Sequence, residues 1–253
     1  MKNGKYGLGI LGLGGRGVYF GGKSFQASEN FYIACLCDVK QEKCDAARAI
    51  LGSDIPAYTD VHEFLRDPNL DAVIVATPDY AHAACAIEVL NARKHLYLEK
   101  PMAQTIEDCD AIIEAWKGSG TVFMVGLELR YCTLMQHLEC HFTPEYTREF
   151  MFIGDKGKIE AFYNNEQEFR IKLWKRFEKD PVYFYPSKVE GGHGGGDPGI
   201  IRDFFEMIRK GKPCMKGIKG ARDSAAIAIA AYESEKTGLP VTIPPVAYPD
   251  GLV

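Results

Sequence analysis

The chain has 253 residues, which is long enough to bury a substantial core and to form two modest domains. Hydrophobic residues make up 46% of the sequence and charged residues 25%, an ordinary globular composition that excludes extensive disorder. The formal net charge of −4, without a basic run, argues against a nucleic-acid partner, and no stretch is apolar for long enough to span a bilayer.

The eight cysteines are scattered along the sequence, and several of them lie in apolar segments. A chain of this size does not need disulfides, so we expect reduced thiols and a cytoplasmic protein. Cys35 and Cys37 share one face of a predicted strand without a second ligand pair nearby, so core packing is expected there and no metal site. The glycine-interrupted N-terminal run lacks a cleavage site and argues against a signal peptide.

The first half of the chain alternates short apolar runs with helical patterns, which is typical of βαβ units in a parallel sheet. Strands are expected at Tyr6–Leu11, Tyr32–Cys37, Ala57–Tyr58, Ala72–Ala76, His95–Leu98 and Val122–Val125. Helices are expected at Gln41–Leu51, Ala81–Ala92 and Ile106–Lys117. We therefore predict an α/β domain over residues 1–130, a Rossmann-type doubly wound parallel sheet that binds a dinucleotide.

The pattern changes after about Arg130. Two strands joined by a tight turn are expected at Arg148–Ile153 and Lys158–Phe162, and the alternation in Phe169–Leu173 predicts an antiparallel strand with one buried face. The closing helices are expected at Gly199–Lys210 and Ala221–Thr237. Residues 131–253 are thus predicted to form a second α+β domain, for substrate binding and oligomerisation, on a shortened, mostly antiparallel sheet.

A glycine-rich loop follows the first predicted strand and matches the pattern G-x-G-x-x-G, here Gly12-Leu13-Gly14-Gly15-Arg16-Gly17. In such a loop the first glycine permits the tight turn, the second lets the backbone approach a pyrophosphate, and the third allows close helix packing. The N-terminus of the next helix offers free amides and a positive dipole end to phosphates. We predict that this loop binds a dinucleotide.

Asp38 ends the second apolar run, about twenty residues past the loop, where a carboxylate accepts hydrogen bonds from the ribose hydroxyls. It would repel a 2′-phosphate, so NAD is expected in preference to NADP, although Lys40 nearby softens this preference.

A second polar cluster follows two later strands. Thr77, Pro78 and His82 come after Ala76, and Glu99 and Lys100 come after Leu98. Because parallel strands end at one edge of the sheet, these residues are expected to line the cofactor site. For His82, a solvated position on the first turn of a helix is an equal alternative.

These residues, together with Gly126–Tyr131, resemble the glucose-fructose oxidoreductase/inositol dehydrogenase family, known as Gfo/Idh/MocA. The resemblance covers Tyr6–Tyr131 and resumes in Arg148–Glu160, Gly191–Asp197 and the closing helices. It implies a Rossmann domain followed by an open sheet that carries the substrate site and often an oligomer interface. It also implies NAD(P)-dependent chemistry on sugars, inositols and related polyols.

The resemblance places Lys100, the lysine of the family's E-K-P motif, beside nicotinamide and substrate, with Glu99 holding it. A lysine there can hydrogen-bond the reacting oxygen and join proton transfer. A plain surface lysine is the alternative. Arg130 and Tyr131 are expected either to contact a substrate hydroxyl or to pack between domains.

The sequence departs from the family where its members usually carry a helix with an aspartate and, four residues on, a histidine. That pair is not found, and the chain is shorter than its relatives, consistent with an internal loss. The glycine-rich segment Gly191–Asp197 offers His193 as a substitute base. Alternatively the segment only leads into a helix that Asp197 caps near Pro198.

The function expected from these residues is an NAD(P)-dependent oxidoreductase that moves a hydride between nicotinamide and a sugar or cyclic polyol. Two alternatives stay open: a glycosidase that recycles bound NAD, and a catalytically impaired relative or sensor that only binds the cofactor.

Overall fold

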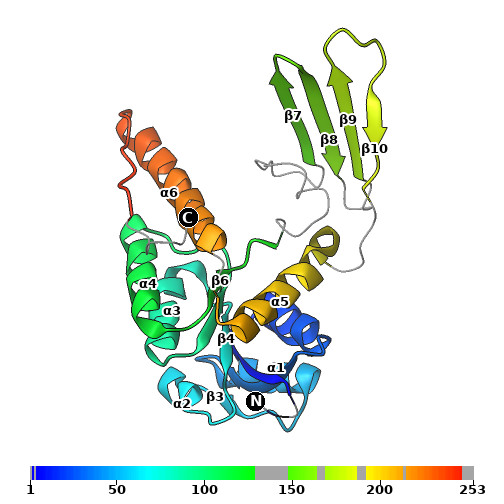
Figure 1. The fold of residues 1–253 in the computed structure, drawn as a ribbon. Coiled ribbons are helices and arrows are strands. Elements are labelled where there is room, and N and C mark those ends of the chain that lie inside the picture. The colour runs from blue at the N-terminus through cyan, green and yellow to red at the C-terminus, as the bar shows by residue number, and fades with distance from the viewer. Residues whose placement is uncertain are drawn as a thin grey trace. The chain divides into compact units, whose positions relative to one another are not determined.

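The computed structural model describes residues 2, 4–128, 148–163, 169–186, 192–212 and 215–246 of the chain. They form two compact units, one of residues 1–127 with 201–253 and the other of residues 128–200 (Figure 1). The closing residues thus group with the N-terminal unit, whereas the sequence analysis placed them in the second domain.

Six parallel strands form the sheet of the first unit in the order β3-β2-β1-β4-β5-β6. The strands are β1 Tyr6–Leu11, β2 Phe31–Cys37, β3 Ala57–Tyr58, β4 Ala72–Val75, β5 His95–Leu98 and β6 Phe123–Val125. This is the order of dinucleotide-binding sheets, in which the chain reverses direction of winding between β1 and β4. The predicted Rossmann-type sheet is confirmed.

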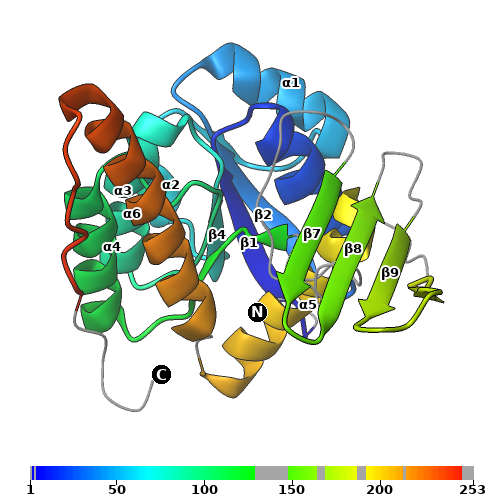
Figure 2. The same ribbon diagram turned by 90° about the horizontal axis from the view of Figure 1, so that it is seen from above.

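Helices cover both faces of this sheet (Figure 2). They are η1 Gly17–Ser24, α1 Gln41–Leu51, α2 Val61–Leu65, η2 Asp79–Ala81, α3 His82–Asn91 and α4 Ile106–Ser119. Helix α4 begins where Thr105 Oγ1 accepts a hydrogen bond from Asp108 N at 3.1 Å, and it ends at Gly120, whose φ is +70°. Such a capping threonine and left-handed glycine are the ordinary signals that start and stop a helix.

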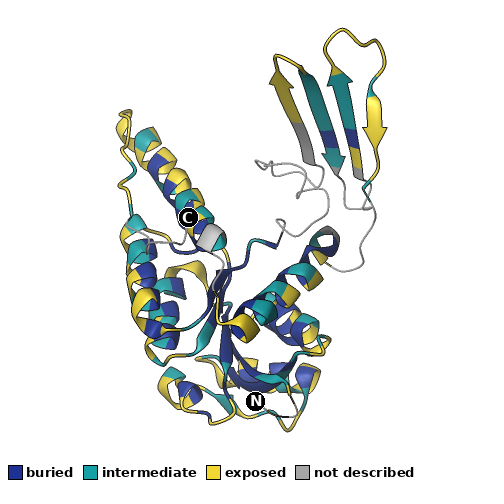
Figure 3. Cartoon of the chain, in the orientation of Figure 1, coloured by how far each residue is buried: buried dark blue, intermediate teal, exposed yellow. Residues whose placement is uncertain are grey.

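The strands are buried on both faces, as Figure 3 shows by the dark blue of the central sheet. Val73, Val75 and Leu98 belong to one core cluster, together with buried residues of α3, α4 and the last helix. The alternate side chains Ile74 and Tyr97 are also fully buried. Burial on both faces explains the continuous apolar runs that predicted a parallel sheet.

The two closing helices, α5 Gly192–Lys210 and α6 Met215–Thr237, explain the change of unit. Phe204 of α5 is fully buried, and its ring centroid lies 5.8 Å from that of Tyr97. Arg222 of α6 is 1% exposed, and its Nε donates to Asp110 Oδ1 of α4 at 2.9 Å. The units divide between Leu127 and Glu128, close to the predicted boundary at residue 130, and again within α5 between Ile200 and Ile201, so that residues 201–253 group with the first unit.

The second unit contains an antiparallel sheet in the order β10-β9-β8-β7. Its strands are β7 Arg148–Gly154, β8 Gly157–Tyr163, β9 Phe169–Lys175 and β10 Val182–Phe184. The tight turn between β7 and β8 and the antiparallel β9 are confirmed, whereas β10 was not predicted. Among the described helices of the chain, none combines the length and the hydropathy that a membrane span requires.

We predict that Phe204→Ala lowers the free energy of unfolding by about 3–5 kcal/mol, because it removes a buried ring from the aromatic core of the first unit. Ile227→Ala, at a 61% exposed position on α6, serves as the control and should change stability by less than about 0.5 kcal/mol. Urea denaturation measures both. Equal stability of the two variants would contradict the packing of α5 described above.

Candidate functional site

Three loops meet at the carboxyl edge of the parallel sheet. Backbone hydrogen bonds hold the ends of neighbouring strands side by side, from Ala76 N to Leu11 O at 2.8 Å and from Glu99 N to Val75 O at 2.9 Å. The glycine loop after β1, Thr77 after β4 and Lys100 after β5 therefore lie at one edge. This is where ligands bind in open parallel sheets.

The three glycines of the motif occupy different environments. Gly12 has φ +94°, and a Cβ on it would lie 2.6 Å from Thr77 N. A Cβ on Gly17 would collide with the carbonyl oxygen of Gly12. At Gly14 and Gly15, by contrast, nothing lies within 4 Å of an added Cβ. The outer glycines are thus required by packing inside the protein, whereas the middle of the loop borders open space.

Asp38 joins the end of β2 to this loop. Its Oδ2 accepts a hydrogen bond from Leu13 N at 2.9 Å, and its Oδ1 accepts one from Lys40 N at 3.1 Å. The residue is only partly buried. Because an ionised carboxylate has about four lone-pair sites, acceptor capacity for ribose hydroxyls is left over.

Arg16 and Glu99 form an ion pair that joins the glycine loop to the turn after β5. Arg16 Nε lies 2.5 Å from Glu99 Oε1, and the guanidinium stacks 3.9 Å above the ring centroid of Phe20. Glu99 is 4% exposed, and its Oε2 accepts a hydrogen bond from Lys100 N at 3.2 Å. Glu99 thus holds the backbone of Lys100, while the Lys100 side chain is exposed to solvent and the Lys100–Pro101 peptide bond is cis.

This ion pair was not predicted, although the sequence holds a signal for it. A carboxylate at the end of a buried strand needs a cationic partner, since an unpaired buried charge is costly. Arg16 is the cation within the glycine loop. The parallel order of β1, β4 and β5 would then have placed it at the same edge as Glu99.

His82 is 1% exposed, so the alternative of a solvated position is wrong. Its Nδ1 lies 2.7 Å from the carbonyl oxygen of Pro101, and its Nε2 lies 3.0 Å from that of Thr77. The imidazole therefore connects the turns after β4 and β5. Thr77 Oγ1 is buried without a hydrogen-bond partner in the described part of the chain, apart from the weakly bonding thiol of Cys85 beside it.

His193 forms a close pair with Asp197 in α5. Its Nδ1 lies 2.7 Å from Asp197 Oδ1, and Asp197 is 8% exposed. The helix begins at Gly192, so the alternative that Asp197 caps a helix near Pro198 is wrong. The backbone of His193 has φ +52°, a left-handed conformation that costs energy for a residue other than glycine.

The structure does not bring all of the predicted residues into one described site. His193 lies in the unit of residues 128–200, and the glycine loop lies in the other unit. Arg130 and Tyr131 lie outside the described residues. Two groups of predicted residues do lie at the expected edge of the sheet. One group follows β4 and consists of Thr77, Pro78 and His82; the other follows the neighbouring strand β5 and consists of Glu99 and Lys100.

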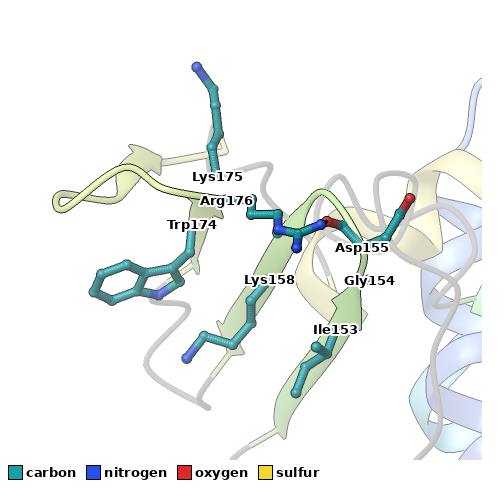
Figure 4. Close-up of a pocket in the computed structure, with 8 residues that line it drawn as sticks. Ile153, Gly154, Asp155, Lys158, Trp174, Lys175 and Arg176 are labelled. Atoms are coloured by element: carbon teal, nitrogen blue, oxygen red, sulfur yellow. Dashed lines mark hydrogen bonds between the residues drawn. The ribbon is translucent and has the colours of Figure 1, made fainter.

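Two other features carry no comparable chemistry. A surface cavity of about 460 Å³ lies at the turn of the β7–β8 hairpin, where Lys158 Nζ lies 5.3 Å from the ring centroid of Trp174 while Lys175 points away from both (Figure 4). Cys35 and Cys37 both lie in the core, where burial raises the pKa of Cys37 to about 12 and keeps its thiol protonated.

Comparisons with known sequences identify the N-terminal unit. The Gfo/Idh/MocA family model, described as an oxidoreductase family with an NAD-binding Rossmann fold, matches residues 6–127. The myo-inositol 2-dehydrogenase of Thermotoga maritima is 29% identical over 124 residues, which cover 49% of this chain and 36% of that protein. The 2,7-anhydro-N-acetylneuraminate hydratase of Escherichia coli is 29% identical over 178 residues, 68% of this chain and 43% of that protein. The chain thus spans less than half the length of these relatives.

Solved structures share the fold at low sequence identity. The aldose-aldose oxidoreductase of Caulobacter crescentus has a TM-score of 0.72 at 16% identity, covering 93% of this chain and 98% of that one. A 3-ketoreductase of Actinomadura kijaniata, solved with NADP and TDP-benzene, has a TM-score of 0.72 at 10% identity, covering 92% and 98%. Residues 6–127 of this chain thus match the NAD-binding Rossmann domain of the Gfo/Idh/MocA oxidoreductase family.

Proposed function

We propose that this protein is an NAD(P)-dependent oxidoreductase that transfers a hydride between nicotinamide C4 and a sugar or cyclic polyol. One observation carries the proposal: the open glycine loop, Asp38 and the Glu99-Lys100 turn lie at one edge of the sheet and are joined by hydrogen bonds. The inositol dehydrogenases among the relatives support the substrate class.

The cofactor would lie across this edge. Its pyrophosphate fits the open space beside Gly14 and Gly15, next to the N-terminus of η1, whose amides and dipole favour an anion. Asp38 would bind the adenosine ribose and disfavour a 2′-phosphate, so NAD is preferred over NADP. Leu13, Thr77, Pro78 and His82 shape the same edge, the last by holding its two turns together.

Lys100 is the polar catalytic group of the proposal. It follows Glu99, which fixes its peptide nitrogen and leaves the side-chain amine exposed at the end of β5. When bound, the nicotinamide accepts or donates the hydride. Lys100 would donate a hydrogen bond to the reacting oxygen of the substrate. This bond would stabilise the negative charge that develops on the oxygen when the oxygen loses or gains its proton.

His193 is the proposed general base in place of the family's missing aspartate–histidine pair. Because the Asp197 carboxylate accepts, Nδ1 of a neutral His193 would donate to it, and Nε2 would be the nitrogen that takes a proton from a hydroxyl. The left-handed φ of His193 is the kind of local strain that clusters at functional sites. Arg130 and Tyr131 would contact further substrate hydroxyls.

The surroundings of the site complete the proposal. A reduced, cytoplasmic setting agrees with free thiols at the described Cys35, Cys44 and Cys109. The second sheet would carry the substrate site and a contact surface between copies of the chain. It would correspond to the family's open sheet without the first strands of that sheet.

A second candidate is a redox-neutral reaction in which bound NAD is reduced and reoxidised within one turnover, as in an NAD-dependent glycosidase. The relative named as a hydratase of an anhydro sugar, which matches more of this chain than the inositol dehydrogenases do, favours it. A third candidate is a protein that binds the cofactor without turnover. It applies if Lys100 and His193 contact no substrate.

One experiment separates these functions. The chain is incubated with NAD and a panel of inositols, aldoses and glycosides, while NADH absorbance and released reducing sugar are both followed. Steady NADH formation is expected for the oxidoreductase. Released sugar without net NADH would establish the redox-neutral reaction, and NADH binding without either product would contradict enzymatic function.

Asp38→Ala should weaken NADH binding by about tenfold and NADPH binding by less, because only the unmodified ribose loses two hydrogen bonds to a charged acceptor. Fluorescence titration with each dinucleotide measures this difference. Asp45→Ala, an exposed carboxylate on α1, is the matched control and should change neither affinity. Equal losses for NADH and NADPH in Asp38→Ala would remove the ribose role.

Lys100→Ala should lower kcat by about 10²–10⁴, the usual contribution of a general acid–base group, with little change in the Kd of NADH. The comparison uses the substrate found in the panel above. Lys43→Ala removes an exposed lysine on α1 and should leave kcat unchanged. If Lys100→Ala retained full turnover, a surface role for this lysine would be established.

His193→Asn should also lower kcat by about 10²–10⁴ while NADH affinity stays unchanged. Asparagine tolerates the left-handed φ at this position, so the fold is expected to survive the change. His62→Asn, at an exposed histidine of the other unit, is the control. Undiminished turnover of His193→Asn would leave the pair with Asp197 a structural role only.

A further inference from the structure

Arg16 stands where a phosphate ligand would be expected. It is the fifth residue of the glycine loop, follows the open positions Gly14 and Gly15, and directly precedes the helix η1. A guanidinium in such a place usually makes bidentate contacts with phosphate oxygens. In this structure the guanidinium contacts the carboxylate of Glu99 and the ring of Phe20.

Glu99 connects two segments through its two carboxylate oxygens. Oε1 binds Arg16 of the glycine loop, and Oε2 binds the peptide nitrogen of Lys100. Since Glu99 is only 4% exposed, water compensates little for the loss of either contact. A displacement of Arg16 is therefore transmitted to the peptide of Lys100.

The guanidinium of Arg16 packs on a buried aromatic ring. It stacks on Phe20, which is 3% exposed, and the Phe20 ring centroid lies 5.5 Å from that of Tyr97 on β5. The helix after the glycine loop and the strand before Lys100 thus contact each other beneath the ion pair. The guanidinium is held between two groups whose positions depend on the same core.

We propose that Arg16 is a positioning residue: acting through Glu99, it sets the Lys100 turn against the glycine loop and couples dinucleotide binding to the placement of Lys100. The inference rests on the proposed function, because it assumes that the loop binds the pyrophosphate and that Lys100 faces the nicotinamide. It adds that Arg16 acts through Glu99 and contributes little as a direct phosphate ligand.

ADP and NADH distinguish the two roles, because ADP carries the phosphates and lacks the nicotinamide. Affinities of both are measured by calorimetry for the wild type, Arg16→Met, Glu99→Gln and the double variant, with the emission spectrum of bound NADH as a readout of the nicotinamide surroundings. Thermal melts report folding. Arg16→Lys and the isosteric Glu99→Gln form a second cycle, which decides the question if Arg16→Met fails to fold.

Each single variant should lower the affinity for NADH by about tenfold, as expected for loss of one charged hydrogen bond. Each should also shift the emission spectrum of bound NADH. The double variant should be no weaker than either single variant, because both changes break one connection. ADP affinity should stay within about twofold of the wild-type value in all variants.

Two results would overturn the inference. If Arg16→Met weakened ADP binding as much as NADH binding, Arg16 would be a phosphate ligand. If the losses of NADH affinity in the two single variants multiplied in the double variant, the two residues would act independently. Failure of the wild type to bind NADH at all would instead contradict the proposed function. The two failures are therefore distinguishable.

Discussion

Parallel pairing of β1 with β4, and of β4 with β5, is the constraint on which the candidate site depends. It forces three loops that are distant in sequence to leave the sheet at one edge. Gly12 and Gly17 then allow the first loop to pack within contact distance of its neighbours, where any larger residue would collide with backbone. The site is thus a consequence of strand order, with glycine placed where the backbone comes closest.

Side chains hold these loops at fixed separations. Asp38 binds the glycine loop to β2, Glu99 binds it to the turn after β5, and His82 joins that turn to the one after β4. Each of these side chains contacts a different loop from its own. The charge of the buried Glu99 is compensated by Arg16, whose side chain is partly exposed, and the Lys100 side chain stays exposed to solvent.

The sequence predicted those features that local patterns encode. Apolar runs and their alternation with helices gave the six-stranded sheet, and turn and strand patterns gave the β7–β8 hairpin. The partner of an amphipathic helix is not encoded in its own periodicity, so the packing of Phe204 and Arg222 on the first unit was missed. Four glycines and Pro198 disfavoured a helix at Gly192, and the buried contacts of His82 and Arg16 depend on chain segments far away in sequence.

A crystal structure of the chain with NADH is the most direct test of the central claim, that the dinucleotide lies across the carboxyl edge of the parallel sheet. The account predicts the pyrophosphate beside Gly14 at the N-terminus of η1, the adenosine ribose on Asp38, and the nicotinamide beside Lys100. A dinucleotide bound away from the glycine loop, or one whose nicotinamide lies far from Lys100, would contradict it.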